Sequence, residues 1–545
     1  MASSARRVVT ALLLALLLTV GGTSRALAAG EVAAPNDPLW PEQWALDARP
    51  GVGLNVLEAW KYSKGEGIVV AVVDTGITNH PEFKGRVLPG YDFVTNERAA
   101  GDGDGRDADP SDPGDYITEE EIQSGGVFAG CRAEDSSWHG THVAGIVLAA
   151  ANNEAGVVGV APEAKLLPVR ALGKCGGSDS DLVDSLRWAA GLPVSGAPEN
   201  QNPARIINVS LGGEGACSSR MQGAVDEISA KGAIIVVSVG NSNRDASFYS
   251  PANCRGTLTV GALTRDGFRS SYSNFGDYVD LSAPGGDDLA EVLNAYNGGP
   301  KAPEAATYKA ISGTSMSTPH VSGVLALAWS ADPTLPRDEL IKLLFSSLSP
   351  FVQDGSSLGC TQQSLCGAGA ANAGALLAAL VARPVPQLVV SGASVMEVGS
   401  SQAFAVTLEG SDARVVVTTT ELCSLSEGVL TALGRGNCLL QFTQGSSARY
   451  RASNTTINVR VSGLQPTVVI DPIATIKVRA ARAIMVQAES DGARTFKSLS
   501  KGICSVTANG LIRGKAAGVC KVRVRTAGTL LYEPDRQTLE IRVRR

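Results

Sequence analysis

The chain has 545 residues, which is too long for one ordinary domain and predicts two to four domains. Because 44% of its residues are hydrophobic, it can build several apolar cores, and this excludes a disordered protein. The net charge of −6 is distributed unevenly: residues 465–545 carry fifteen Lys and Arg against six Asp and Glu, so this segment is +9 and the remainder is −15.

The first 28 residues have the pattern of a secretory signal peptide. Arg6 and Arg7 precede the apolar run 8–20, and Ala26-Leu27-Ala28 offers a small-residue cleavage site. That run is too short for a membrane span, and no later segment is long and uncharged enough. We therefore expect a secreted, extracellular protein without a membrane span.

From Gly67 onward, apolar runs of strand length alternate with segments of helix length. The run Ile68–Val73 is rich in β-branched residues, which is typical of a strand buried on both faces. Further strand-like runs lie at 165–169, 205–209, 233–237 and 258–260, and helix-length segments lie at 141–151, 181–190 and 218–230. This alternation predicts an α/β fold with a doubly wound, mostly parallel sheet in three layers, and with its functional groups at the carboxyl ends of the strands.

The helical pattern ends near Ala382, and Arg383-Pro384-Val385-Pro386 has the composition of a linker. Short alternating strands follow, and the segment around 423–440 matches the segment around 504–522 at a shift of about 81 residues, which indicates an internal repeat. Each unit has the length of an immunoglobulin domain and resembles bacterial Ig-like repeats. We predict a signal peptide at 1–28, an α/β domain at 29–382, and two all-β Ig-like modules, the first with its linker at 383–464 and the second at 465–545.

Ten cysteines in an exported chain indicate disulfide bonds. Short sequence separation favours three local bonds, Cys360–Cys366, Cys423–Cys438 and Cys504–Cys520. Four cysteines remain without an assigned partner: Cys131, Cys175, Cys217 and Cys254. Since none of these four lies in a Cys-x-x-Cys motif, zinc and redox chemistry are disfavoured.

Three short motifs carry side chains suited to acyl transfer. Asp74-Thr75-Gly76 follows the first strand, and His139-Gly140-Thr141-His142 begins a helical segment. Ser315, in Gly313-Thr314-Ser315-Met316, stands where a small-residue turn meets a long apolar segment. A helix starting there would point free N–H groups and the positive end of its dipole at the hydroxyl. The motifs and the order Asp, His, Ser resemble the subtilisin-like serine protease family over residues 35 to about 382.

This resemblance implies a secreted serine endopeptidase that acts on proteins or peptides. Ser315 would be the nucleophile, His139 its general base, and Asp74 the group that orients the imidazole. Asn241 would hold the oxyanion together with the N–H of Ser315. By the same resemblance, substrate would contact two segments of the cleft: Ser210, Leu211 and Gly212 on one wall, and Ser238, Val239 and Gly240 on the other. Members of the family often carry an inhibitory pro-domain ahead of this region, for which the sequence offers no room; either the protein folds without one, or the sequence is not the complete precursor.

Calcium is the cofactor that we expect, as a structural ion. The turn-rich loop 101–115 contains six aspartates, and oxygen ligands of this kind suit calcium, although a solvated acidic loop is the alternative. The candidate ligands there are Asp102, Asp104, Asp107, Asp109 and Asp112. The resemblance implies a second calcium site, formed by Glu82, Asn153 and backbone carbonyls of Ala155 and Val157.

The basic C-terminal unit contains Lys521-Val522-Arg523-Val524-Arg525, and alternation places these charges on one strand face. Such a face can be solvated, can guard an edge strand, or can attract an anionic envelope or matrix surface. Nucleic acid is disfavoured because aromatic residues for base stacking are scarce. We expect a monomer.

Two other functions compete with the endopeptidase. An ester hydrolase is opposed by the order of the three residues and by the missing Gly-x-Ser-x-Gly elbow. An exported binding or adhesion protein with an inactive protease-like domain is opposed by the intact set Asp74, His139, Ser315 and Asn241.

Overall fold

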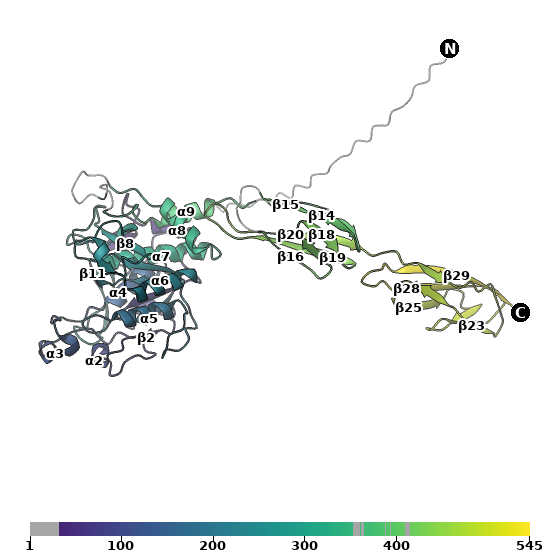
Figure 1. Ribbon diagram of the computed structural model, residues 1–545, viewed down its shortest axis with the longest axis horizontal. Helices are drawn as coiled ribbons and strands as arrows, with labels where there is room; N and C mark the ends of the chain where they lie inside the picture. Colours follow the sequence, from purple (N-terminus) through teal and green to yellow (C-terminus); the bar gives the residue numbers. More distant parts are fainter. Residues whose placement is uncertain (1–31, 353–359, 361–364, 387, 393, 409–414) are drawn as a thin grey trace, which may run out of the picture.

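The computed structural model describes residues 32–352, 360, 365–386, 388–392, 394–408 and 415–545. Figure 1 shows an α/β domain followed by two β modules, arranged one after another with the C-terminus at the far end. The signal peptide predicted for residues 1–28 lies outside the described residues. Within the described part of the chain, no helix has both the length and the apolarity needed to cross a membrane.

The centre of the α/β domain is a seven-stranded sheet in which every neighbouring pair is parallel, with the order β2-β3-β1-β4-β6-β8-β9. Its strands are β1 (Val69–Asp74), β2 (Tyr91–Asp92), β3 (Lys165–Arg170), β4 (Ile206–Val209), β6 (Ile234–Ser238), β8 (Leu258–Leu263) and β9 (Leu281–Pro284). The parallel sheet predicted from the apolar runs is confirmed.

Helices cover both faces of this sheet, because alternate strand residues point to opposite sides. Val70 and Val72 pack in one core with α4 (His139–Leu148), α7 (Thr314–Ala331), α8 (Arg337–Ser346) and α9 (Ala373–Ala382). Ala71 and Val73 pack in a second core with α5 (Asp179–Ala189) and α6 (Ser219–Ala230). The predicted three layers are therefore present. Shorter elements complete the domain: α1 (Val56–Ala59), α2 (Glu97–Ala100), α3 (Glu119–Ser124), β5 (Gly213–Glu214), β7 (Tyr249–Ser250), β10 (Val292–Asn297) and β11 (Ala306–Ile311).

The two C-terminal modules share one topology. Each has a four-stranded sheet, of order β13-β20-β19-β16 in the first module and β22-β29-β28-β25 in the second. Three-stranded sheets, β14-β18-β17 and β23-β27-β26, accompany them. The first module contains β12 (Leu388–Ser391), β13 (Val395–Glu397), β14 (Ser401–Ala403), β15 (Ala405–Leu408), β16 (Val415–Thr419), β17 (Cys423–Ser426), β18 (Val429–Ala432), β19 (Gly436–Gln444) and β20 (Ser453–Ser462). The second contains β21 (Val468–Ile470), β22 (Thr475–Lys477), β23 (Ala481–Ala483), β24 (Val486–Ala488), β25 (Arg494–Ser498), β26 (Cys504–Val506), β27 (Leu511–Gly514), β28 (Gly518–Thr526) and β29 (Asp535–Arg544).

Ion pairs mark both junctions between these units. Arg383, which follows α9 and is buried, donates to the Asp332 carboxylate at 2.6 Å. Arg435 of the first module pairs with Glu533 of the second at 2.9 Å. The structure contains the three local disulfide bonds expected from sequence distance, and it joins the other four cysteines as Cys131–Cys175 and Cys217–Cys254.

Candidate active site

Asp74 and His139 meet at the carboxyl end of the sheet. Asp74 is the last residue of β1 and is completely buried, and its Oδ1 lies 2.7 Å from Nδ1 of His139, the first residue of α4. The backbone N–H of Thr75 donates to the same oxygen at 2.8 Å and fixes the carboxylate. Because a carboxylate only accepts hydrogen bonds, Nδ1 carries the proton and Nε2 is left free to accept another.

The surroundings of His139 favour its cation. Burial works against the charge, but the Asp74 carboxylate and its hydrogen bond outweigh burial, so the pKa of His139 is raised above 6.5, with smaller contributions from Asp115 and Asp112. The imidazole keeps 23% of its side-chain surface exposed, so it remains accessible from the cleft. The ring can therefore accept a proton and hold it as a stabilised cation.

Two further aspartates, whose position beside His139 the sequence did not reveal, support this pair. Asp115 accepts hydrogen bonds from the N–H and the hydroxyl of Ser137, each at 2.6 Å, and the N–H of His139 donates to the Ser137 hydroxyl at 3.3 Å. Asp112 is buried and accepts from the Thr75 hydroxyl at 2.7 Å, and burial raises the pKa of Asp112 to about 7. The only sequence signal for the position of Asp112 was the Asp-Thr-Gly motif. The hydroxyl of its threonine, Thr75, contacts both Asp112 and the N–H of Gly140 at the start of α4.

Ser315 is the second residue of α7, so its N–H belongs to the first turn and has no intrahelical partner. Its hydroxyl donates to the backbone carbonyl of Ser210 at 2.9 Å, and the Ser210 hydroxyl donates back to the carbonyl of Ser315 at 2.8 Å. Ser315 thus lies at the positive end of an 18-residue helix and is tied to the segment that follows β4.

Asn241 is held so that its amide can donate into the cleft. Its Oδ1 accepts from the N–H of Thr314 at 2.9 Å and from the Thr314 hydroxyl at 2.8 Å, which leaves Nδ2 as a free donor group. The preceding Gly240 has φ of 102°, and a Cβ there would lie 2.4 Å from the Asn274 amide nitrogen, so only glycine fits this turn.

These side chains share one cavity of about 720 Å³. Its lining includes most of the predicted site residues: His139, Ser315, Asn241, Ser210, Leu211, Gly212, Ser238 and Gly240. Val239 does not line it, because its side chain is buried against Ala246 and Val279. Val239 supports the wall from behind instead of forming part of it.

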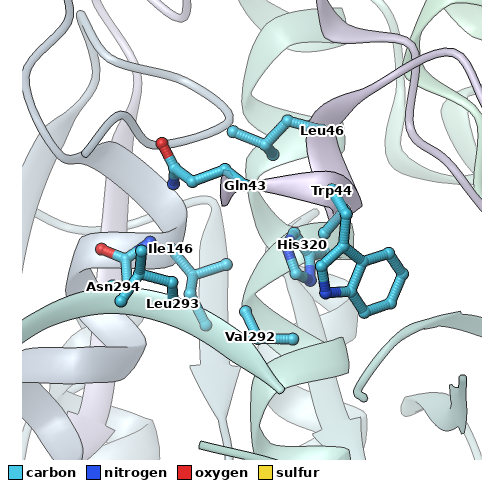
Figure 2. A pocket seen from close by; sticks show the side chains of 9 residues that line it. Gln43, Trp44, Leu46, Ile146, Val292, Leu293, Asn294 and His320 are labelled. Carbon is cyan, nitrogen blue, oxygen red and sulfur yellow. The ribbon is translucent and has the colours of Figure 1, made fainter. Parts of the chain in front are cut away.

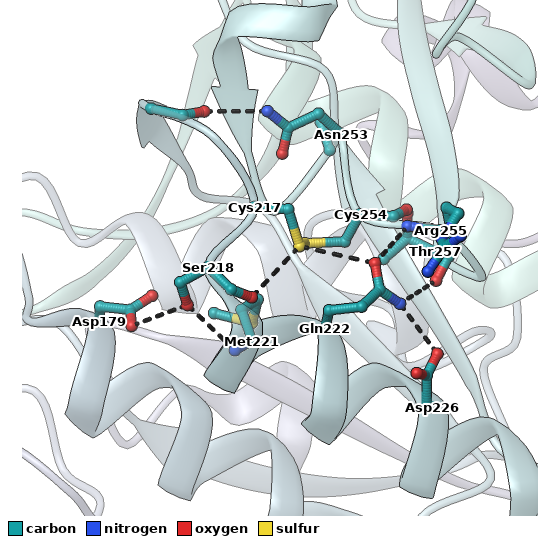
Figure 3. The surroundings of a disulfide bond; sticks show 12 residues. Asp179, Cys217, Ser218, Met221, Gln222, Asp226, Asn253, Cys254, Arg255 and Thr257 are labelled. Atoms are coloured by element: carbon teal, nitrogen blue, oxygen red, sulfur yellow. Dashed lines mark hydrogen bonds between the residues drawn. A yellow bond between two sulfur atoms is a disulfide. The ribbon is translucent and has the colours of Figure 1, made fainter.

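Two disulfide bonds lie at or next to the lining of this cavity. Cys175, bonded to Cys131, belongs to the lining. Figure 3 shows the Cys217–Cys254 bond next to Ser218, which also lines the cavity, and next to Gln222. The Gln222 amide accepts from the N–H of Arg255 and donates to its carbonyl, each at 2.9 Å, so the wall is closed by covalent and hydrogen bonds.

A family model described as the subtilase family matches residues 65–369, more than half of the chain. The chain belongs to the subtilase family. It is 44% identical over 347 residues to the extracellular protease of Xanthomonas campestris pv. campestris, which is 64% of this chain and 57% of that protein. It is 45% identical over 326 residues to the extracellular basic protease of Dichelobacter nodosus, which is 58% of this chain and 53% of that protein.

Among solved structures, the chain is similar to a protease from Pseudoalteromonas arctica PAMC 21717. The TM-score is 0.59 at 44% identity, over 64% of this chain and the whole of that one. The chain thus spans somewhat more than half the length of the curated relatives it matches.

Two other histidines of this subtilase are structural. His142 is buried, burial lowers its pKa to about 3, and its Nε2 lies 3.0 Å from the carbonyl of Lys309. His320 is also buried, burial lowers its pKa to about 4, and its Nδ1 lies 3.0 Å from the carbonyl of Pro284. Figure 2 shows the cavity next to His320 and Trp44, which has a volume of about 10 Å³ and has room for one water molecule at most.

The aspartates predicted to bind calcium do not converge. Asp102 pairs with the buried Arg170, Asp112 faces Thr75 near Asp74 and His139, and Asp104 points to solvent. The carboxylates of Asp107 and Asp109 accept backbone N–H groups two residues further on, at 2.7 Å and 3.0 Å. No group of three or more His, Cys, Asp or Glu side chains that could hold a metal occurs in the described residues. This loop therefore does not fit a calcium ion.

The second predicted calcium site is occupied by hydrogen-bond donors. The Glu82 carboxylate accepts from the Asn153 amide at 2.9 Å, from the N–H of Val157 at 3.3 Å and from the Tyr308 hydroxyl at 3.0 Å. The Asn153 carbonyl oxygen accepts from the N–H of Ala155 at 3.0 Å. A calcium ion requires oxygen atoms directed at one point, whereas N–H and O–H groups surround this carboxylate.

Proposed function

We propose that this subtilase is a secreted serine endopeptidase that hydrolyses protein or peptide substrates through Asp74, His139 and Ser315. The observation that carries the proposal is the 2.7 Å contact between Asp74 and His139 at the edge of the cavity that also contains Ser315 and Asn241. A buried carboxylate, an imidazole with a raised pKa and a serine at a helix N-terminus are the parts required for acyl transfer. The names of the two relatives, both extracellular proteases, support secretion and proteolysis.

The reaction begins when Ser315 exchanges one hydrogen bond for another. Its hydroxyl leaves the carbonyl of Ser210 and donates to Nε2 of His139, which accepts the proton as the oxygen attacks the peptide carbonyl. Asp74 stabilises the resulting imidazolium. His139 then gives the proton to the departing amine, and the acyl group remains on Ser315. A water molecule next gives a proton to His139 and attacks the acyl carbon, and His139 returns this proton to the Ser315 oxygen as the acid leaves.

The negative oxygen of each tetrahedral intermediate is held by two donors. The N–H of Ser315 supplies one, with the dipole of α7 behind it, and the amide of Asn241 supplies the other. The Asn241 carbonyl is already engaged with Thr314, so the amide cannot turn its oxygen towards the intermediate without losing two hydrogen bonds.

Substrate would bind as an added strand between two walls. Ser210, Leu211 and Gly212 would pair with its backbone on one side, and Ser238 and Gly240 line the other. The small residues leave room for a bulky apolar side chain next to the scissile bond. We expect the protein to act as a monomer, and binding of the basic module to an anionic surface would accompany catalysis without contributing to it.

Casein hydrolysis by purified wild type and by Ser315→Ala tests the proposal. We expect the variant to lose at least about a thousandfold in rate. Ser229→Ala is the matched control: this serine lies on α6, and its hydroxyl has no hydrogen-bond partner, so activity should persist. Equal cleavage by all three proteins would identify another nucleophile, and folded but inactive wild type would favour the binding-protein alternative.

A further inference from the structure

The outer face of the four-stranded sheet in the second module is predominantly basic. Along β28 and β29, Cys520, Val522 and Ile541 point into the core, so the residues between them point outward. Lys477 of β22 and Lys497 of β25 lie on the same outer side. The basic face consists of these two lysines with Lys521, Arg523, Arg525, Arg536, Arg542 and Arg544.

Like charges stand directly opposite one another across this face. Arg525 pairs in register with Arg536, Lys497 with Arg523, and Lys477 with Arg544. Such pairs destabilise a sheet. Glu540 is the one acidic residue on the outer side of these described strands, and it is bound to Lys521 at 2.6 Å. The repulsion within the basic face is therefore largely uncompensated in the protein itself.

Arg523 shows how crowded the centre of the basic face is. Its Nε is shielded from solvent and has no hydrogen-bond partner. Desolvation and the neighbouring cations Arg536 and Arg525 lower the pKa of Arg523. An anion bound to the outer edge of this guanidinium would offset the repulsion between the three cations.

Protection of a sheet edge does not explain this arrangement. Charges that guard an edge belong on the outermost strands, which here are β22 and β25. Six of the eight cations lie instead on the two inner strands, β28 and β29.

Solvation does not explain it either, because the first module keeps the matching face exposed with far fewer cations. Its β19 and β20 correspond to β28 and β29, with a cysteine at the third position of both nine-residue strands. At the positions of Lys521, Arg523, Arg525 and Arg536, the first module has Leu439, Gln441, Thr443 and Asn454. On these two strands only Arg460, at the position of Arg542, keeps a positive charge. The same fold therefore remains stable with mostly neutral side chains on this face.

We propose that the basic face binds a linear anionic polysaccharide, and that the second module thereby holds the protease on polysaccharide-rich material. Alternate side chains repeat about every 6.8 Å along a strand and strands lie about 4.8 Å apart, so the cations form a flat lattice suited to a chain of regularly spaced carboxylates or sulfates. Arginine binds such groups with two parallel hydrogen bonds.

Other anionic partners fit the basic face less well. It contains no aromatic side chain on which bases could stack, which disfavours single-stranded nucleic acid. Val519 is its only apolar outward residue on β28 and β29, so nothing there would insert into a lipid bilayer. In Figure 1 this module lies at the end of the molecule far from the α/β domain, so a bound polymer would leave the cleft open.

The test uses the full chain with Ser315→Ala, which prevents self-digestion and makes the result independent of the proposed peptidase activity. Binding is measured with heparin and polygalacturonate as sulfated and carboxylated probes, and with dextran as the neutral one. We expect both anionic polymers to bind, dextran not to bind, and affinity to fall as salt is raised.

The decisive variant gives the basic face the residues of the first module, Arg523→Gln, Arg525→Thr and Arg536→Asn. Because these residues occupy the matching strands of the first module, the fold should persist, which a thermal melt checks. We expect about tenfold weaker binding. The matched control, Arg482→Gln, Lys501→Gln and Arg513→Gln, removes the same charge from exposed positions outside the basic face and should bind as before.

The reciprocal variant adds arginine at Gln441, Thr443 and Asn454 and should strengthen binding. Equal weakening by the decisive and control variants would overturn the proposal, because net charge alone would then be responsible. Binding to anionic vesicles or single-stranded DNA but not to the polysaccharides would also overturn it.

Discussion

The α/β domain and the two β modules place their polar groups by different means. In the α/β domain, Asp74 and Asn241 follow parallel strands, β1 and β6, that end at one edge of the sheet, and Ser315 lies at the start of helix α7. In the second module, Lys521, Arg523 and Arg525 are sequence neighbours that share a face because a strand alternates. The first arrangement produces a few oriented groups in a cavity, which suits chemistry, and the second produces a flat array, which suits adhesion.

If this contrast is correct, changing one oriented group should have a large effect on catalysis. We expect Asp74→Asn to lower kcat by about four orders of magnitude, because an amide at this position would favour the wrong imidazole tautomer. Steady-state kinetics on a chromogenic peptide measure the loss. The triple variant of the basic face provides the comparison and should leave this rate unchanged; a small effect of Asp74→Asn would mean that the carboxylate is only structural.

Asn241→Ala should have the next largest effect. The loss of one oxyanion donor costs about 2.7–4 kcal/mol of transition-state stabilisation, so kcat should fall about 10²–10³-fold while KM changes little. Asn241→Asp tests whether the N–H₂ donor itself is needed, because it keeps the size of the side chain and its acceptor bonds to Thr314 but replaces the donor with a negative charge. A rate close to wild type in both variants would exclude Asn241 from the site.

The arrangement also predicts a pH dependence. His139 must be neutral to act as a base, and its raised pKa means that kcat/KM falls as the pH drops through a value above 6.5. Asp115 contributes to this shift, so Asp115→Asn should lower the pKa of His139 and move the acidic limb to lower pH. Asp109→Asn is the control, because it removes the same charge from an exposed part of the same loop; a shift of equal size in both would show a general charge effect.

Metal removal should have the smallest effect of these changes, and the quantity that it tests is thermal stability. Because hydrogen-bond donors occupy Glu82 and the loop aspartates do not converge on one point, a chelator should change the Tm by less than about 1 °C. A thermal melt with and without EDTA measures this. A drop of several degrees would show that calcium binds through oxygens that these contacts do not identify.

The features that could be predicted from the sequence are those that leave a pattern in neighbouring residues. Apolar runs identified five of the seven strands of the parallel sheet and missed β2 and β9, and short motifs located Asp74, His139 and Ser315. Alternation also predicted the basic strand face. These features depend on neighbouring residues and on the rule that parallel strands end together.

The remaining features depend on contacts between distant segments. Asp112 looked like a metal ligand and Asp115 was assigned no role, because their packing against Thr75 and Ser137 is not encoded in the spacing of the loop. Val239 faces the core and not the cleft, which only the packing against Ala246 and Val279 reveals. The Cys131–Cys175 and Cys217–Cys254 bonds span separations of 44 and 37 residues, too far for local distance to assign them.

The most direct measurement is covalent labelling of the nucleophile with an organophosphorus fluoridate, with the labelled residue located by mass spectrometry. A serine activated by a neighbouring histidine displaces fluoride and keeps the phosphoryl group. We predict one label, on Ser315, that is absent when His139 is replaced by alanine. A label on another serine, or on Ser315 at the same rate without His139, would contradict the assignment of the active site.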